Sequence, residues 1–256
     1  MKLIRRQSIA TNTLPLDVRR ARRVSSVDSI EGTEVLGSGG FGTCYEAIYK
    51  NMRVCIKRLN RTSKRKAQIE SFQAETREEI FEFDHPNIGK LFAASKPSKL
   101  QTSDVNIGSL TIVYEYIEGC SLQSVIDNLS ESIDLSRMSR ISTEIASALN
   151  YVHGYKIAHL DLKPANVMCT KQGVCKLIDF GCSQYIRDDP ATPSRSMLTG
   201  TFAYRAPELL KGGSPSAKCD AYSIGKCMLD FMDTRLEFYY LSQALIHSSN
   251  ILRLAI

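Results

Sequence analysis

No two cysteines in this chain have the CxxC spacing that zinc sites favour, although the sequence contains eight cysteines. Several of them lie inside apolar runs such as Val54-Cys55-Ile56. We therefore interpret them as reduced thiols of an intracellular protein. The chain also lacks an apolar run long enough to cross a membrane, and its first residues lack the apolar core of a signal peptide. These absences predict a cytoplasmic protein without a membrane partner.

The net charge is small outside the first thirty residues. Residues 1–30 hold seven basic and two acidic side chains, which accounts for +5 of the net charge of +6. The remaining 226 residues carry only +1, so no general polyanion-binding surface is expected on the folded part. We interpret residues 1–30 as a flexible basic extension, and we expect no nucleic-acid partner.

Strand patterns dominate the first part of the folded region, and helix patterns dominate the second. Three antiparallel strands are predicted over residues 34–59, one helix over 64–83, and two further strands over 91–94 and 110–116. After Gly119, apolar residues recur at helical spacing from Met138 to Val152, which predicts an amphipathic helix. A short hairpin is expected around Gln172-Gly173. The expected class is α+β, with a five-stranded sheet and one helix followed by a mainly helical part.

Two polar runs carry the groups that phosphoryl transfer requires. The first is His159-Leu160-Asp161-Leu162-Lys163-Pro164-Ala165-Asn166, and Asp179-Phe180-Gly181 follows thirteen residues after its end. Asp161 is placed to accept the proton of an attacking hydroxyl, and Lys163 can bridge that carboxylate and the transferring phosphate. Asn166 and Asp179 are expected to hold Mg²⁺ ions, which neutralise charge on nucleotide phosphates.

A glycine-rich run precedes these groups. Gly37-Ser38-Gly39-Gly40-Phe41-Gly42 lies between two strand-like segments, which favours a hairpin that covers phosphates over a dinucleotide-binding fold. Glycines there allow backbone amides to approach the phosphates. Lys57 is expected to contact the α- and β-phosphates, held by a helix carboxylate. Glu75 is the predicted carboxylate, and Glu79 is the alternative.

With these motifs the chain resembles the protein kinases, and among them the Mos kinases, germ-cell serine/threonine kinases that phosphorylate MAP kinase kinase. The resemblance rests on residues 159–166, 174–183 and 204–212, with weaker support from 37–47 and 71–75. It implies a bilobal kinase domain over 31–228, divided into an N-lobe (31–117) and a C-lobe (118–228), with a diverged segment over 229–256. It also implies a monomeric serine/threonine protein kinase that uses ATP and Mg²⁺ and acts on MAP kinase kinase during oocyte meiosis.

The resemblance also implies the lining of the ATP site. The expected residues are Leu36, Gly37, Gly39, Gly40, Gly42, Cys44, Cys55, Lys57, Glu75, Tyr114, Glu115, Tyr116 and Asp179. Cys44 stands where a valine usually covers the adenine. The backbone of the segment from Tyr114 to Tyr116 would meet the adenine, and the Tyr114 side chain would narrow the pocket behind it.

One departure from the kinase pattern concerns regulation. Leu160 occupies a position where many kinases have arginine. Without that guanidinium, a phosphate on the activation segment loses its usual charge partner. We therefore predict that activity does not depend strictly on phosphorylation of Thr192, Ser194, Ser196 or Thr199.

A second departure lies near the C-terminus. Only 36 residues follow Asp220, without the expected helices or a clear arginine partner for Glu208. Arg235 and Arg253 are candidate partners, and a buried Glu208 without one would destabilise the fold by a few kcal/mol. An incomplete C-lobe is expected. The alternatives to an active kinase are a catalytically impaired, kinase-like binding protein or a truncated isoform. A small-molecule phosphotransferase ranks third, because Thr201 and Ala206-Pro207-Glu208 indicate a protein substrate.

Overall fold

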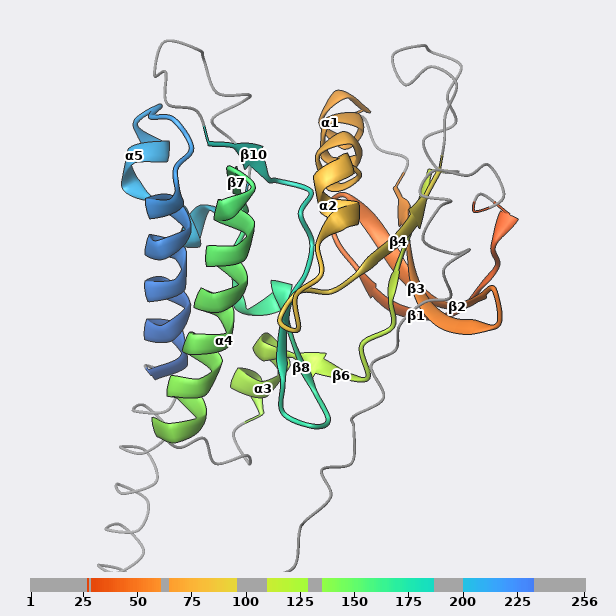
Figure 1. Cartoon of the computed structure of the whole chain (residues 1–256), viewed down its shortest axis with the longest axis horizontal. Coiled ribbons are helices and arrows are strands. Elements are labelled where there is room, and N and C mark those ends of the chain that lie inside the picture. The colour runs from red at the N-terminus through yellow and green to blue at the C-terminus, as the bar shows by residue number, and fades with distance from the viewer. Residues whose placement is uncertain are drawn as a thin grey trace, which may run out of the picture.

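A sheet-rich part and a helix-rich part lie side by side in the computed structural model (Figure 1). The structure describes residues 27, 29–60, 65–95, 110–128, 135–186 and 200–232. Most of the predicted basic extension and of the segment 229–256 lies outside these residues. So do Arg235, Arg253 and the four candidate phosphorylation sites of the activation segment.

The predicted five-stranded antiparallel sheet is confirmed. Its strands are β1 (Gly32–Ser38), β2 (Gly42–Tyr49), β3 (Met52–Leu59), β4 (Leu91–Ala94) and β5 (Thr111–Glu115), in the order β1-β2-β3-β5-β4. Lys50 and Asn51 join β2 to β3 with φ values of 48° and 61°. Two consecutive positive φ values are typical of the tight turn whose twist matches that of a hairpin. This turn fixes an unbroken register of eight pairs, from Gly42–Leu59 to Tyr49–Met52.

The prediction of one helix over 64–83 is wrong, because the chain forms two helices, α1 (Arg65–Glu75) and α2 (Glu78–Glu82). Between them, the Thr76 hydroxyl and N–H both donate to the Phe72 carbonyl oxygen, at 2.7 and 3.0 Å. Arg77 then adopts an extended conformation, with ψ of 151°. The break directs the Arg77 guanidinium toward Ser183, 106 residues later.

The helix-rich part contains the predicted amphipathic helix and hairpin. Its elements are β6 (Gly119–Ser121), α3 (Leu122–Asp127), α4 (Leu135–Gly154), β7 (Ile157–Ala158), the 3-10 helix η4 (Pro164–Asn166), β8 (Val167–Thr170), β9 (Cys175–Leu177), β10 (Gln184–Tyr185), η5 (Phe202–Tyr204), α5 (Pro207–Leu210) and a helix over residues 217–232. Strands β6, β8 and β9 form one small sheet, and β10 pairs with β7. The Ser121 hydroxyl accepts a bond from the Ser124 N–H at 3.1 Å and caps α3.

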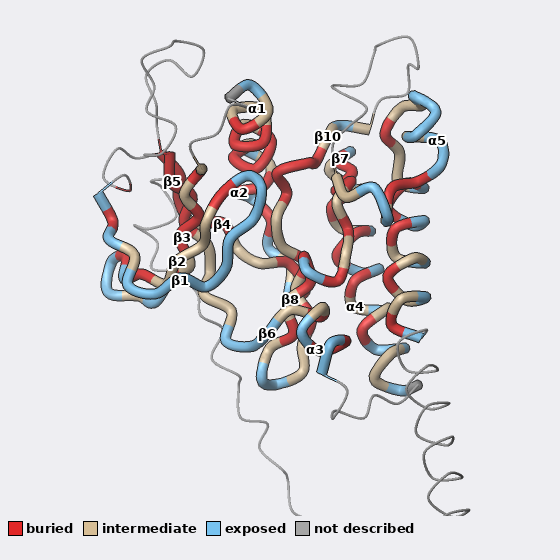
Figure 2. The backbone as a smooth tube through the Cα atoms, turned by 180° about the vertical axis from the view of Figure 1, so that it is seen from behind, coloured by how far each residue is buried: buried red, intermediate tan, exposed pale blue. Residues whose placement is uncertain are grey.

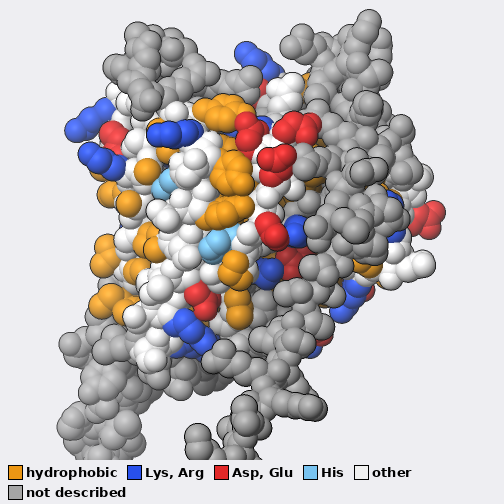
Figure 3. Space-filling view, in the orientation of Figure 1, with side chains coloured by type: hydrophobic (Ala, Val, Ile, Leu, Met, Phe, Trp, Pro, Cys, Tyr) orange, Lys and Arg blue, Asp and Glu red, His pale blue; other side chains and the backbone are white. Residues whose placement is uncertain are grey.

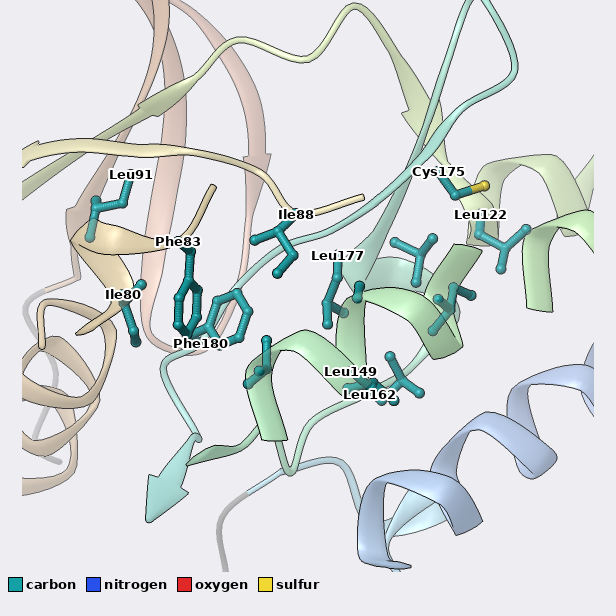
Figure 4. Close-up of a cluster of buried hydrophobic side chains, with 14 of the residues drawn as sticks. Ile80, Phe83, Ile88, Leu91, Leu122, Leu149, Leu162, Cys175, Leu177 and Phe180 are labelled. Atoms are coloured by element: carbon teal, nitrogen blue, oxygen red, sulfur yellow. The ribbon is translucent and has the colours of Figure 1, made fainter. Parts of the chain in front are cut away.

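A single apolar cluster joins the two parts. It includes Ile112 of β5, Ile145 of α4 and Leu177 of β9, all at most 2% exposed. Figure 2 shows buried backbone in both parts, and Figure 4 shows Phe83 and Phe180 side by side within the cluster. The ring centroids of Phe83 and Phe180 are 5.4 Å apart in an edge-to-face arrangement. The shared core fixes the end of α2 against the Asp179-Phe180-Gly181 segment.

Side chains of both charge signs lie among apolar ones on the face seen in Figure 3. This mixture agrees with the small net charge expected for the folded part. Within the described ranges, no helix is both long enough and apolar enough to cross a bilayer.

Candidate active site

Asp220 positions the loop that carries Asp161. It lies in the helix over 217–232, is fully buried, and accepts bonds from the backbone N–H groups of His159 and Leu160, both at 2.8 Å. Its Oδ2 also lies 2.8 Å from His153 Nε2. Leu160 has φ of 63°, a conformation that costs a non-glycine residue roughly 1–3 kcal/mol. The two backbone bonds to the buried carboxylate hold the loop in this unfavourable conformation.

The three predicted catalytic residues lie together with Thr201. Asn166 Nδ2 donates to Asp161 Oδ2 at 3.1 Å and to the Asp161 carbonyl oxygen at 2.8 Å. The Thr201 N–H and hydroxyl donate to Asp161 Oδ1 at 2.7 and 2.8 Å. Lys163 Nζ lies 3.2 Å from Asp161 Oδ2 and donates to Thr201 Oγ1 at 2.8 Å. A carboxylate, an ammonium and a hydroxyl therefore meet at one point of the catalytic loop.

Lys57 joins β3 to α1 and to the loop after β9. Its Nζ lies 2.8 Å from Glu75 Oε2 and 2.8 Å from Asp179 Oδ1. Lys57 is 6% exposed and Glu75 is 1% exposed. Glu79, the alternative partner, instead accepts a bond from the Tyr185 hydroxyl at 2.8 Å. The structure thus brings Glu75, rather than Glu79, to Lys57.

The three charges shift one another's pKa. Burial alone would lower the pKa of Lys57, but the Asp179 and Glu75 carboxylates outweigh it and raise this pKa above its ordinary value. Burial raises the pKa of Glu75 to about 7, although Lys57 opposes this shift. Burial also raises the pKa of Asp179, but Lys57 reverses that effect and lowers it to about 2. At neutral pH Asp179 is therefore ionised, whereas Glu75 titrates.

This titration predicts that nucleotide affinity depends on pH. From about pH 8 to about pH 6, Mg-ATP affinity should fall with uptake of one proton and a midpoint near 7, because protonated Glu75 no longer holds Lys57. Binding titrations across this range measure the midpoint. The Tyr114 hydroxyl donates to Glu75 Oε1, which favours the carboxylate, so Tyr114→Phe should move the midpoint upward. The step should vanish in Glu75→Gln, and its persistence there would assign it to another group.

The glycine-rich loop is closed by one backbone bond and leaves open space at two of its glycines. The Gly39 N–H donates to the Gly42 carbonyl oxygen at 2.8 Å, which closes the β1–β2 turn. A Cβ on Gly42 would lie 2.6 Å from the Arg58 carbonyl oxygen, so glycine is required there by the neighbouring strand. At Gly37 and Gly40 a Cβ would have no described atom within 4 Å. Contacts within the described protein thus explain Gly42, and the open face of the loop leaves room for phosphates at the other two.

The side chains of the predicted hinge make contacts with other parts of the protein. Glu115 carboxylate oxygens accept bonds from Lys176 Nζ at 2.9 Å. The Arg53 guanidinium carbon lies over the Tyr116 ring, 3.8 Å from the ring centroid. These side chains are therefore held by contacts within the protein, and the Glu115 N–H donates to the Lys90 carbonyl oxygen at 2.8 Å. Leu36, 42% exposed on β1, and the half-buried Cys44 on β2 are the predicted lining residues nearest the glycine-rich loop in sequence.

Asn166 and Asp179 fit a divalent cation that arrives with phosphates. Both bonds from Asn166 to Asp161 come from Nδ2, so neither of them involves the side-chain amide oxygen of Asn166. Asp179 contributes an ionised carboxylate. Among the residues that the structure describes, no group of three or more His, Cys, Asp or Glu side chains is arranged to hold a metal. Mg²⁺ usually takes one or two protein oxygens and completes its shell with phosphates and water, so Asn166 and Asp179 would suffice to hold it.

The comparisons with known proteins agree with this geometry. The protein kinase domain family matches residues 30–255. The chain belongs to the protein kinases. The bilobal α+β fold class predicted from the sequence is thereby confirmed. The match also takes in nearly all of the segment 229–256, which the sequence analysis had set apart as diverged.

Its similar relatives include several Mos kinases. The kinase is 39% identical over 215 residues to serine/threonine-protein kinase mos of Patiria pectinifera, covering 82% of this chain and 58% of that protein. It is 36% identical over 196 residues to the proto-oncogene serine/threonine-protein kinase mos of Rattus norvegicus, covering 74% and 57%. The Sus scrofa protein is 36% identical over 230 residues, covering 82% and 64%. The chain thus spans less than two thirds of these relatives' length.

One expectation about the site is wrong, and the contacts of two residues were not anticipated. Glu208 is exposed and accepts a bond from Cys219 Sγ at 3.4 Å, so the expected cost of a buried, unpaired Glu208 is wrong. Sequence reasoning also missed Arg77, which lies in the unexpected break between α1 and α2. No pattern in the sequence singles out that arginine, since its partners are more than a hundred residues away. Thr201 had been used only to indicate a protein substrate, and it contacts Asp161 directly.

Proposed function

We propose that this kinase transfers the γ-phosphoryl group of ATP to serine or threonine hydroxyls of a protein. The contact of Asp161 with Lys163, Asn166 and Thr201 carries the proposal, because it combines a proton acceptor with a cation at one point. Lys57, positioned by Glu75, is the second cation of the site. Each of these groups matches a role that phosphoryl transfer requires.

In this proposal each residue has one task. Asp161 orients the substrate hydroxyl and accepts its proton, while Lys163 neutralises charge on the phosphoryl group. Lys57 holds the α- and β-phosphates, and the glycine-rich loop covers them. Asn166 and Asp179 hold Mg²⁺, which supplies charge neutralisation on the phosphates when bound. The segment from Tyr114 to Tyr116 provides backbone groups for the adenine.

MAP kinase kinase is the proposed substrate, and oocyte meiosis the proposed setting, with the kinase acting as a cytoplasmic monomer. Support comes from the Mos names of the similar relatives and from the leucine-containing loop around Leu160. A kinase-like binding protein is the second candidate function. The catalytic groups assembled around Asp161 and Lys57 favour an enzyme over that role.

The test is phosphorylation of a catalytically inactive MAP kinase kinase by the 256-residue chain. Activity that disappears in both Asp161→Asn and Lys57→Met would support the proposal, including its substrate. A folded chain that binds MAP kinase kinase without phosphorylating it would favour the binding role. Activity toward a general protein substrate but not toward MAP kinase kinase would retain the kinase activity and reject the proposed substrate.

Activation-segment phosphorylation is expected to have little influence on activity. Leu160 is buried in an apolar cluster with Ala158, Ala206 and Cys219, so no arginine is available at this position to bind a phosphate. Alanine and phosphomimetic variants of Thr192, Ser194, Ser196 and Thr199 should change kcat/KM by less than about tenfold, the effect of one interaction of ~1.4 kcal/mol. Steady-state kinetics measure this, and a change of several orders of magnitude would contradict it.

The contact between Arg77 and Ser183 also supports activity without activation-segment phosphorylation, and it can be tested separately. Arg77 donates to Ser183 Oγ at 2.9 Å and to the Ser183 carbonyl oxygen at 3.0 Å, and it lies 4.7 Å from the Tyr185 ring centroid. These contacts tie the α1–α2 break to the start of the activation segment without a phosphate. Arg77→Met should lower kcat/KM by at least about tenfold, because charged hydrogen bonds contribute about 1.5–3 kcal/mol. Substitution of the exposed Lys171 by Met is the control and should have no effect.

A further inference from the structure

Two half-buried thiols lie on the strands that carry Lys57. Cys44 is on β2 and Cys55 is on β3. The register pairs Cys44 with Lys57 and Glu46 with Cys55. Paired residues share a face of the sheet, as do residues two apart along one strand. Cys44, Cys55 and Lys57 therefore share one face, which is the face from which Lys57 reaches Glu75.

The two thiols are in hydrogen-bond contact. The Cys55 thiol donates to the Cys44 sulfur, and this bond lowers the pKa of Cys44. Burial opposes the shift, the Lys57 ammonium adds to it, and the more distant Glu75 and Asp179 carboxylates oppose it. The same contact, together with burial, raises the pKa of Cys55. Of the two thiols, Cys44 is therefore the one that loses its proton more readily, and a partly accessible thiol of lowered pKa beside a second cysteine is typical of oxidation-sensitive pairs.

The other six cysteines have different surroundings. Cys169, Cys175, Cys182, Cys219 and Cys227 are buried, and Cys120 is exposed. Cys169 and Cys175 face each other across β8 and β9 with their sulfur atoms 3.5 Å apart. They lie in the apolar core, with 7% and 2% exposure, and their mutual hydrogen bond and burial raise the pKa of Cys175. This second pair offers an internal comparison, since its sulfurs are close but inaccessible.

We propose that Cys44 and Cys55 form an oxidation site for peroxides in the wall of the nucleotide site, and that their disulfide and a bound nucleotide exclude each other. The thiol chemistry follows from the pair itself. The exclusion rests on the proposed function, which puts ATP beneath β2 and β3.

The reaction requires only a peroxide and the two thiols. The Cys44 thiolate attacks a peroxide oxygen, an S–O bond forms, the O–O bond breaks, and the released hydroxide takes up a proton as water. The Cys55 sulfur then attacks the Cys44 sulfenic acid, an S–S bond forms, the S–O bond breaks, and the second thiol proton leaves in a second water. The two thiols lose two electrons in all, and the peroxide gains them.

The disulfide is expected to displace the glycine-rich loop. Diagonal neighbours on antiparallel strands hold their Cβ atoms farther apart than the ~3.8 Å that a disulfide favours. Closing the bridge therefore draws β2 toward β3 near Cys44, two residues after Gly42. A Cβ on Gly42 would lie only 2.6 Å from the Arg58 carbonyl oxygen, so β2 has little room to approach β3 at this point. The loop must move instead, and a nucleotide held under the loop resists that movement.

Peroxide treatment of the reduced 256-residue chain, followed by thiol blocking and peptide mapping, tests the thiol pair. The expected product is a Cys44–Cys55 disulfide, about 2 Da lighter, that forms before any Cys169–Cys175 disulfide. Cys44→Val should abolish this product, and Cys169→Ala should leave its rate unchanged. A disulfide forming first at Cys169–Cys175, or a Cys44 sulfenic acid that Cys55 does not capture, would overturn the proposal.

A second arm tests the exclusion. Mg-ATP at about ten times its Kd should slow disulfide formation about tenfold, because only the free protein reacts. The oxidised chain should bind Mg-ATP at least about tenfold more weakly, and a reductant should restore binding. A disulfide that forms equally fast with bound nucleotide would overturn the exclusion and retain the thiol pair. A reduced chain that forms the disulfide but does not bind Mg-ATP would overturn the proposed function instead.

Discussion

The Asp161→Asn variant is expected to transfer phosphate about 10²–10⁴ times more slowly than the unmodified chain, the usual contribution of a general base. Asp161 Oδ1 accepts two bonds from Thr201, and Oδ2 faces Lys163 and Asn166. An asparagine of the same shape still accepts from Thr201, but it cannot take the proton of the substrate hydroxyl. Single-turnover phosphorylation of a protein substrate measures the loss.

A measurement of nucleotide binding distinguishes a variant that lacks only the proton acceptor from a variant that is misfolded. Mg-ATP affinity of Asp161→Asn should stay close to that of the unmodified chain, because Lys57 and Asp179 are the groups assigned to the phosphates and the metal. Asp127→Asn, which changes an exposed carboxylate at the end of α3, is the matched control and should retain full activity. A rate within about tenfold for Asp161→Asn would remove Asp161 from the proposed mechanism.

Replacement of Asp220 by alanine should lower the free energy of unfolding by about 2–6 kcal/mol. The variant leaves the buried N–H groups of His159 and Leu160 without their acceptor, and each such loss costs about 1–3 kcal/mol. Leu160 also loses the bond that holds its positive φ. Chemical denaturation of the 256-residue chain measures the change.

Asparagine at position 220 provides the graded comparison. Asp220→Asn retains one oxygen, so it should satisfy one backbone N–H and lose about half of the stability that Asp220→Ala loses. Glu118→Gln, at an exposed ion pair with Lys171, should leave unfolding unchanged. Equal stability of Asp220→Ala and the unmodified chain would show that other groups hold the catalytic loop.

The predictions from sequence succeeded where short-range patterns decide the structure. The strands over 91–94 and 110–116, the helix through Ile145 and the hairpin around Gln172-Gly173 follow from periodicity and turn residues. They failed at Thr76 and Arg77, where the extended conformation of Arg77 and its distant contacts with Ser183 interrupt the local helix pattern. The expected burial of Glu208 failed for a similar reason, because burial depends on which segments pack over a residue.

The sequence by itself determined the inventory of chemical groups and their order: a glycine-rich loop, Lys57, the run from His159 to Asn166, and Asp179. Their spacing identified the protein kinase fold, since each group belongs to a short segment whose conformation is largely local. Only the tertiary structure decided which groups meet. It paired Lys57 with Glu75 rather than Glu79, put Thr201 on Asp161, and brought Arg77 to Ser183. Such contacts join residues 18 to 106 positions apart, and they arise from packing of a shared core rather than from local sequence.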